Sequence, residues 1–258
     1  SFLLLTADTP LFNTWYIHYG LKVRPDVNFI SMVANNSLHK LTDDYLKKFP
    51  KDSKDPDLVA KALLNISGKV PVFSNLKIQP SKGKKLVWIP YGLVYKLEND
   101  TKKILPESEF LKIQSEIWSK FKNKNINNID NPSVNSLTIS EITLAYSNSM
   151  VDQGDYIFNQ YHDSNLALKY FNKAIDFDNN NANAYLALAV FQMSNLNCQK
   201  SQDNIFKAMD INPLNNKAYY FLYINYKFCF KDIKKSADVV KNYNNIFRGD
   251  FFKDFKAN

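Results

Sequence analysis

The sequence contains few of the residues that build catalytic or metal sites. Only three histidines and two cysteines occur among its 258 residues. The cysteines, Cys198 and Cys229, have neither metal-ligand spacing nor a Cys-x-x-Cys motif. Glycine is also scarce, with six residues, and no G-x-G-x-x-G or Walker signature is present. The sequence therefore predicts no catalytic residue, no metal site and no cofactor.

Long apolar runs are missing as well. No stretch approaches the ~18–20 apolar residues that a membrane-spanning helix needs, and no signal-peptide pattern is present. The chain begins at Ser1, directly inside a strand pattern. We therefore expect that it is a fragment from which preceding sequence has been removed.

The charge of the chain is positive and uneven. The formal net charge is +8; residues 1–136 hold 20 Lys and Arg against 13 Asp and Glu, whereas residues 137–258 hold 13 against 12. The basic half predicts either a solvated surface or contact with an anionic membrane surface. Only Arg24 and Arg248 are arginines. Since arginine dominates base and phosphate recognition, this scarcity argues against nucleic acid as a partner.

The first thirty residues predict a β-α-β unit. Phe2–Leu5 is a short, bounded apolar run that predicts a buried strand. A helix is expected from Pro10, with Asp8 or Thr9 as its cap. Val27–Val33 predicts a second buried strand, and a β-α-β unit implies that the two strands are parallel and joined by a right-handed crossover.

The pattern continues as a small α/β domain over residues 1–121 with a mostly parallel sheet. Proline and glycine in Pro90-Tyr91-Gly92 place that stretch at an edge, bulge or turn. Residues 122–136 are polar and rich in asparagine, which predicts a linker. The other expected elements are helices at 37–49, 55–64 and 106–121 and strands at 70–76 and 86–89.

Residues 137–258 repeat with a period of 34. Ala174-Ile-Asp176 recurs as Ala208-Met-Asp210, and Ala184-Tyr185 recurs as Ala218-Tyr219. This is the period of tetratricopeptide (TPR) repeats, so we expect a TPR-like α-solenoid. The predicted helix pairs span residues 138–178, 182–211 and 216–247. Both cysteines fall in these helices, where buried thiols are the simplest interpretation and a disulfide is the alternative.

The candidate binding residues form two groups. Strand ends in a doubly wound sheet predict a ligand crevice at Asp8, with Arg24, Asp26 and Tyr91 as further candidates. Each has a structural alternative: Asp8 as a helix cap, Arg24 and Asp26 as a turn contact, and Tyr91 as a core ring. In the solenoid, the residues that could line a peptide-binding groove are Asn183, Asn216, Lys217 and Tyr220.

Two stretches of the α/β domain carry a family resemblance. They are Thr6-Ala-Asp8, Leu11, Trp15-Tyr16, Gly20 and Arg24-Pro-Asp-Val27 near the start, and Pro71-Val-Phe-Ser with Trp88-Ile-Pro-Tyr-Gly-Leu-Val-Tyr95 near the end. Together they resemble the segment just after the membrane region in multi-spanning O-mannosyltransferase-like proteins, which are GT-C type glycosyltransferases.

The resemblance implies a location and partners for this chain. It would be the non-catalytic C-terminal region of the enzyme, on the periplasmic or luminal face of the membrane. A preceding transmembrane domain would transfer mannose or a similar sugar from a polyprenyl-phosphate donor to protein Ser or Thr. The repeats would then engage the acceptor or a partner protein. Two alternatives remain at this point: a free-standing TPR scaffold, and a small enzyme with its site at the Asp8 and Arg24 crevice.

Overall fold

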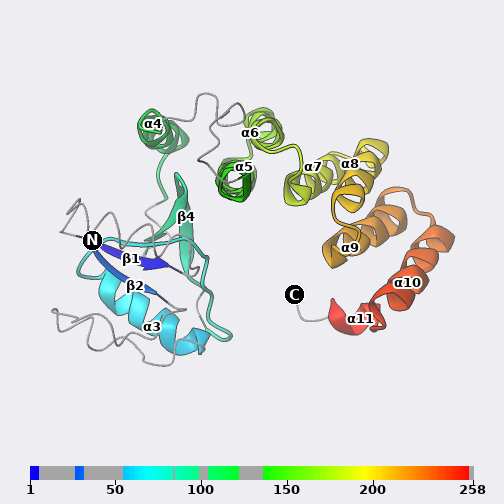
Figure 1. Ribbon diagram of the computed structural model, residues 1–258, viewed down its shortest axis with the longest axis horizontal. Helices are drawn as coiled ribbons and strands as arrows, with labels where there is room; N and C mark the ends of the chain where they lie inside the picture. Colours follow the sequence, from blue (N-terminus) through cyan, green and yellow to red (C-terminus); the bar gives the residue numbers. More distant parts are fainter. Residues whose placement is uncertain (6–26, 32–54, 84, 99–103, 122–135, 256–258) are drawn as a thin grey trace. The chain divides into compact units, whose positions relative to one another are not determined.

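The computed structural model describes residues 1–5, 27–31, 55–83, 85–98, 104–121 and 136–255 (Figure 1). The chain divides into two compact units, residues 1–122 and residues 123–258, which we call the sheet unit and the helical unit. The first combines strands with helices, and the second is helical in the residues described. The architecture is therefore an α/β unit followed by an all-α unit.

The sheet unit is built on a five-stranded sheet with the order β2-β1-β3-β5-β4. Strand β1 pairs in parallel with β2 and β3, whereas β5 pairs antiparallel with β3 and β4. The parallel pairing predicted for the first two strands is confirmed. The prediction of a mostly parallel sheet is wrong, because β4 and β5 form a hairpin and give the sheet a mixed character. The strands are β1 (Phe2–Leu5), β2 (Asn28–Ser31), β3 (Val72–Ser74), β4 (Val87–Tyr91) and β5 (Val94–Glu98).

Gly92 makes this hairpin feasible. It is the first of the two residues that join the paired Tyr91 and Val94, and its φ of 63° is the positive value that a type II′ turn requires at this position. A Cβ atom there would lie 2.6 Å from the Cγ2 atom of Ile117. Glycine is thus needed both for the turn and for the close approach of the helix that carries Ile117.

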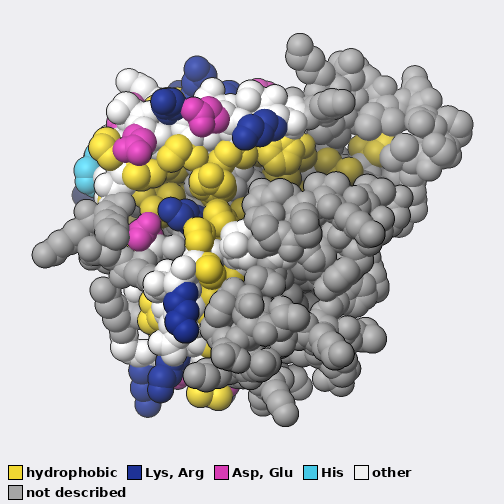
Figure 2. Space-filling model, turned by 90° about the vertical axis from the view of Figure 1, so that its left-hand side faces the viewer, with side chains coloured by type: hydrophobic (Ala, Val, Ile, Leu, Met, Phe, Trp, Pro, Cys, Tyr) yellow, Lys and Arg dark blue, Asp and Glu magenta, His cyan; other side chains and the backbone are white. Residues whose placement is uncertain are grey.

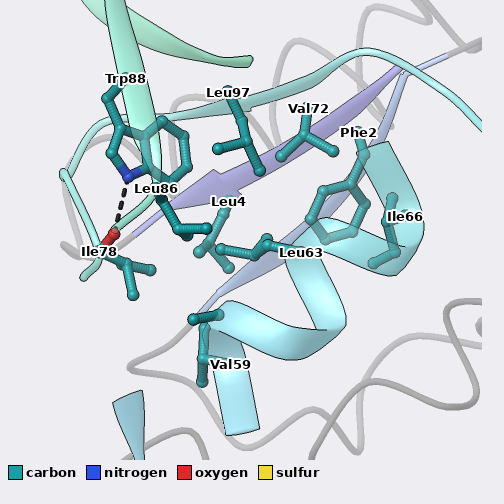
Figure 3. Packing of buried hydrophobic residues seen from close by; sticks show 11 residues of the cluster. Phe2, Leu4, Val59, Leu63, Ile66, Val72, Ile78, Leu86, Trp88 and Leu97 are labelled. Carbon is teal, nitrogen blue, oxygen red and sulfur yellow. Dashed lines mark hydrogen bonds between the residues drawn. The ribbon is translucent and has the colours of Figure 1, made fainter. Parts of the chain in front are cut away.

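The core of the sheet unit lies between the sheet and helix α3 (Pro56–Ser67), as Figure 3 shows. The helix begins as predicted: Asp55 Oδ1 accepts a hydrogen bond from the Asp57 amide at 2.9 Å, and proline occupies its first position. The indole nitrogen of Trp88 donates to the Ile78 carbonyl at 2.7 Å. The buried residues of this core are Phe2, Leu4, Val59, Ala60, Leu63, Ile66, Val72, Ile78, Leu86, Trp88 and Leu97.

Helix α4 (Glu107–Trp118) is fixed to the outer strand through one glutamine. The side chain of Gln114 is buried; its Nε2 atom donates to the Pro90 carbonyl at 2.7 Å, and its Oε1 atom accepts from the Gly92 amide at 3.2 Å. Strand β4 lies at one end of the strand order. The prediction that the Pro90 segment lies at an edge is therefore confirmed.

The helical unit contains three successive helix pairs, and they fall in the three predicted stretches (Figure 1). The third pair includes a π-helix, which was not predicted. Among the described residues, no helix combines the length and the apolar character that crossing a membrane requires. The helices are α5 (Ser136–Tyr161), α6 (Ser164–Phe177), α7 (Ala182–Ser194), α8 (Cys198–Ile211), α9 (Asn216–Ile224), the π-helix η5 (Asn225–Cys229), α10 (Ile233–Phe247) and α11 (Phe251–Asp254).

The ends of these helices recur at a regular interval. Helices α7 and α9 begin after Asn181 and Asn215, 34 residues apart, and both caps accept a backbone hydrogen bond. His162 and Leu196 adopt left-handed φ values of 59° and 58° between the helices of the first and second pairs, again 34 residues apart. Left-handed non-glycine residues are uncommon, so their recurrence reflects one repeated turn geometry.

The third pair contains one extra residue. Its left-handed residue is Lys231, 35 residues after Leu196, and the cap of α11 is Asp250, 35 residues after Asn215. The extra residue lies in η5, where the Phe230 amide donates to the Asn225 carbonyl at 2.9 Å. A hydrogen bond that spans five residues instead of four takes up one additional residue per turn.

A disulfide joins η5 to the second pair. Cys198 and Cys229 are bonded, with their Cα atoms 5.6 Å apart. The interpretation of the two cysteines as separate buried thiols is therefore wrong. The Nδ2 atom of Asn225 also donates to the Cys198 carbonyl at 3.1 Å, so the start of α8 is held on η5 by two links.

Candidate functional site

Three of the four predicted groove residues lie in the first turns of α7 and α9. The Asn183 amide donates to Asn181 Oδ1 at 3.0 Å, and the Lys217 amide donates to Asn215 Oδ1 at 3.1 Å. Asn183 and Lys217 thus occupy equivalent places in successive pairs, and both side chains are exposed. The neighbouring residue Asn216 is exposed as well.

Tyr220 has a different environment from these three residues. Its ring is half-buried and stacks on Phe255 with 4.8 Å between centroids. Phe251 contacts the same ring at 6.3 Å and is itself buried. The segment after α10 therefore covers Tyr220, and this tyrosine belongs to the aromatic core of the third pair.

A hollow that sequence reasoning missed lies at the first pair. It has a volume of about 830 Å³ and is formed by the first turns of α5 and the end of α6. The carboxylates of Glu141, Asp176 and Asp178 line it beside apolar side chains that include Leu144 and Phe177. Apolar walls with several carboxylates suit a segment that carries both apolar and cationic side chains.

The hollow had a partial signal in the sequence. Asp176 belongs to the Ala-Ile-Asp triplet that recurs as Ala208-Met-Asp210. Asp178 Oδ1 accepts from the Asn180 amide at 2.9 Å, as Asn212 Oδ1 does from the Leu214 amide at 3.1 Å. The triplets therefore mark the ends of α6 and α8. They could not reveal that α5 begins as early as Ser136 and that its first turns form one wall of the hollow.

The predicted crevice in the sheet unit can be described only at Tyr91. Its ring contacts Phe73 at 5.3 Å, and Tyr91 lines a small cavity of about 50 Å³ between the β4–β5 hairpin and α4. Asp8, Arg24 and Asp26 lie outside the described residues. The contact with Phe73 agrees with the structural alternative, a ring packed against the sheet.

Four tyrosines in the helical unit have raised pKa values. Burial raises the pKa of Tyr146, Tyr156 and Tyr170. For Tyr243, burial raises the pKa most, and the hydrogen bond to Asp254 at 3.0 Å and the negative charge of that residue raise it further. All four rings therefore stay neutral at ordinary pH, as structural core tyrosines do.

Potential metal ligands and charged side chains are both dispersed among the described residues. Within the part of the chain that the structure describes, no group of three or more His, Cys, Asp or Glu residues could hold a metal ion. On the face drawn in Figure 2, basic and acidic side chains are interspersed beside exposed hydrophobic ones.

Comparison with known proteins identifies no relative. No protein-family model, curated protein or solved structure matches the chain.

Proposed function

We propose that the helical unit is a TPR-like solenoid and acts as a protein-interaction module. The observation that carries this proposal is the recurrence of the same turn geometry: left-handed His162 and Leu196 and the caps Asn181 and Asn215 each repeat after 34 residues. This spacing is the TPR period. Buried alanines at equivalent places, Ala174 and Ala208, let the two helices of a pair approach closely.

The binding surface in this proposal is the side of the first helices. In solenoids of helix pairs, equivalent helices stack side by side and create an extended surface. Asn183 and Lys217 would contribute hydrogen-bond donors at equivalent points along it. The hollow beside Glu141 and Asp176 would accept a mixed apolar and cationic part of the same partner.

The disulfide supports an extracytoplasmic location. Disulfides form and persist mainly in oxidising compartments such as the periplasm, the ER lumen and the cell exterior. The Cys198–Cys229 bond closes a loop of 31 residues and is only half-buried. In a reducing compartment, thiols would have access to it.

The wider proposal places the chain in a membrane glycosyltransferase. Its support is the resemblance of the Thr6–Val27 and Pro71–Tyr95 segments to multi-spanning O-mannosyltransferase-like proteins. The chain would be a non-catalytic region that helps the membrane domain to engage its acceptor. A free-standing interaction protein is the second candidate, and the repeated caps favour it equally, since they require no membrane domain.

The interaction module is tested by site-specific cross-linking. A photo-reactive p-benzoylphenylalanine replaces Asn183 or Lys217 in the protein expressed in its own compartment. We expect a discrete adduct of the same mass from both positions. Lys241, which is exposed on α10, serves as the matched control site. Equal labelling from all three positions, or from none, contradicts the proposal.

The glycosyltransferase proposal is tested on the protein with its preceding membrane region. Sugar transfer from a polyprenyl-phosphate donor to acceptor protein is compared with and without residues 1–258. We expect transfer to need the membrane part, and acceptor choice to weaken without residues 1–258. No transfer by the intact protein contradicts the glycosyltransferase proposal but leaves the interaction module standing.

A further inference from the structure

Large apolar side chains and lysines alternate from the end of η5 into the first turn of α10. Phe228 is 61% exposed, Phe230 38% and Ile233 65%. The lysines Lys231, Lys234 and Lys235 lie between and beside them and are exposed too. Exposed aliphatic and aromatic side chains of this size, grouped in one turn, mark a contact surface more often than a solvated one.

The disulfide extends this surface to the preceding turn. Leu196 is 81% exposed in the turn between α7 and α8 and lies two residues before Cys198. Cys229 stands between Phe228 and Phe230, and its Cα atom lies 5.6 Å from that of Cys198. The bond therefore brings the two turns together. We call the combined surface the lysine–aromatic tip; its members are Leu196, Phe228, Phe230, Lys231, Ile233, Lys234 and Lys235.

The tip is held in its exposed arrangement by internal contacts. The Asp232 amide donates to the Tyr226 carbonyl at 2.8 Å, and the Asp232 carboxylate caps α10 by accepting from the Lys235 amide at 2.9 Å. The Tyr226 ring contacts Phe230 at 6.0 Å, and the Tyr226 hydroxyl accepts a hydrogen bond from Gln202 Nε2 of α8. Lys235 Nζ lies 5.5 Å from the centroid of the same ring.

The charge of the tip is strongly positive against the background of its unit. Residues 227–235 contain four lysines and one acid, Asp232, whereas residues 137–258 as a whole are nearly balanced. That single acid is paired with Lys235, with 3.6 Å between Nζ and Oδ2. Lys231 and Lys234 thus give the tip an outward positive charge.

The combination of lysine with apolar side chains distinguishes between two kinds of partner. Protein interfaces are depleted in lysine, whereas surfaces that dock on membranes pair Lys and Arg with Trp, Phe and Leu. The lysines meet anionic headgroups while the apolar side chains enter the boundary between headgroups and acyl chains. We infer that the lysine–aromatic tip docks on the interface of an anionic lipid bilayer. This inference does not depend on the groove proposed for Asn183 and Lys217, which lie at the opposite ends of α7 and of the α9–η5 helix.

The test is vesicle binding by the complete 258-residue chain under oxidising conditions. The vesicles are phosphatidylcholine alone or an equimolar mixture of phosphatidylcholine and phosphatidylglycerol. We expect binding to the anionic vesicles only, weakened by salt. Since each lysine at an anionic surface contributes about a fivefold gain in affinity, we expect Lys231→Glu with Lys234→Glu to weaken binding by at least about 25-fold.

A matched variant separates the tip from the other basic regions. Lys169→Glu with Lys173→Glu changes the net charge equally at two exposed residues of α6, and we expect it to bind nearly as well as the unchanged chain. Insertion is read from Phe228→Trp, whose fluorescence we expect to shift to shorter wavelength on anionic vesicles, relative to the chain that has only its native tryptophans. Circular dichroism and thiol titration verify that each variant keeps its helices and its disulfide.

Several outcomes overturn the inference. These are no binding to either vesicle, an equal loss in both charge variants, and no loss in the Lys231 and Lys234 variant. An unshifted Phe228→Trp spectrum on bound protein would also contradict docking through the apolar side chains. Self-association that disappears in the Lys231 and Lys234 variant would assign the tip to a second copy of the chain instead.

Discussion

The second and third helix pairs of the helical unit share their ends and differ in their interiors. Both begin after a capping asparagine, Asn181 and Asn215, and both turn through a left-handed residue, Leu196 and Lys231. The third pair fits one more residue between these points and holds it in η5. Turn and cap geometry is thus retained while an insertion is absorbed within the helix.

The interiors differ in what fills them. Ala208 of the second pair is fully buried, and its counterpart 35 residues later is Tyr243, which is also buried. Tyr243 contacts Phe247 and Phe251 with ring centroids 4.5 Å and 5.2 Å apart. The third pair therefore replaces close helix approach with an aromatic core shared with α11. The two pairs therefore have the same arrangement of caps and turns but different side chains in their cores.

The largest expected effect comes from giving the third pair the alanine of the second. Tyr243→Ala removes a buried ring and leaves a cavity that the surrounding residues fill only in part. We therefore expect it to lower the free energy of unfolding by about 3–5 kcal/mol. Urea unfolding followed by circular dichroism measures the loss. Tyr220→Ala, at a half-buried ring of the same core, should cost clearly less. An equal cost at both positions would mean that the core is not centred on Tyr243.

The next effect comes from removing the link between the two pairs. Cys198→Ser with Cys229→Ser opens a 31-residue loop, for which chain entropy predicts a loss of about 3–4 kcal/mol. A reductant should destabilise the unchanged chain by the same amount and leave the double variant unaffected. Unfolding that responds equally to reductant in both proteins would contradict the role given to the disulfide.

A smaller effect distinguishes the two capping asparagines. Asn215→Ala should cost about 1 kcal/mol, as the loss of an N-cap does. Asn181 is buried, and its Nδ2 atom also donates to Ser147 Oγ at 2.8 Å and to Asn148 Oδ1 at 2.9 Å. Asn181→Ala should therefore cost about 2–3 kcal/mol. Equal melting temperatures for the two variants would show that the two caps contribute equally to stability.

The smallest expected effect is a pH dependence of stability that arises from Tyr243 in the third pair. Because the pKa of Tyr243 is raised in the folded chain, its neutral phenol contributes stability that is complete below the unfolded pKa of about 10. This contribution is lost as the pH rises through the folded value. Tyr243→Phe should make melting temperature fall less steeply above about pH 10 than it does in the unchanged chain. Identical slopes would contradict the assignment.

The sequence correctly predicted the features that depend on short stretches of residues or on the repeat. Asp55 with Pro56 marks the start of α3, and the 34-residue recurrence of alanines marks the helix pairs. The extra residue in η5 was not predicted, because an insertion of one residue leaves the helical pattern on either side intact. The disulfide was kept only as an alternative, because it depends on the separation of two turns in space. The mixed sheet was predicted wrongly as mostly parallel, because strand direction is a tertiary property.

The candidate site was predicted less completely. Asn183 and Lys217 follow from the repeat alone, since each is the second residue after its cap. The covering of Tyr220 by Phe255 could not be foreseen, because that contact crosses 35 residues and involves a segment after the last complete pair. The hollow near Asp176 likewise depends on where the long helix α5 begins relative to the end of α6.

The side chain of Gln114 has a consequence for solubility. It donates to the Pro90 carbonyl and accepts from the Gly92 amide, so one glutamine bonds the backbone groups that a sixth strand would use at this point. Proline adds a residue with no N–H to offer. An exposed strand edge invites other chains to add to it and to aggregate. Along Pro90–Gly92, the outer rim of the sheet is closed to that addition.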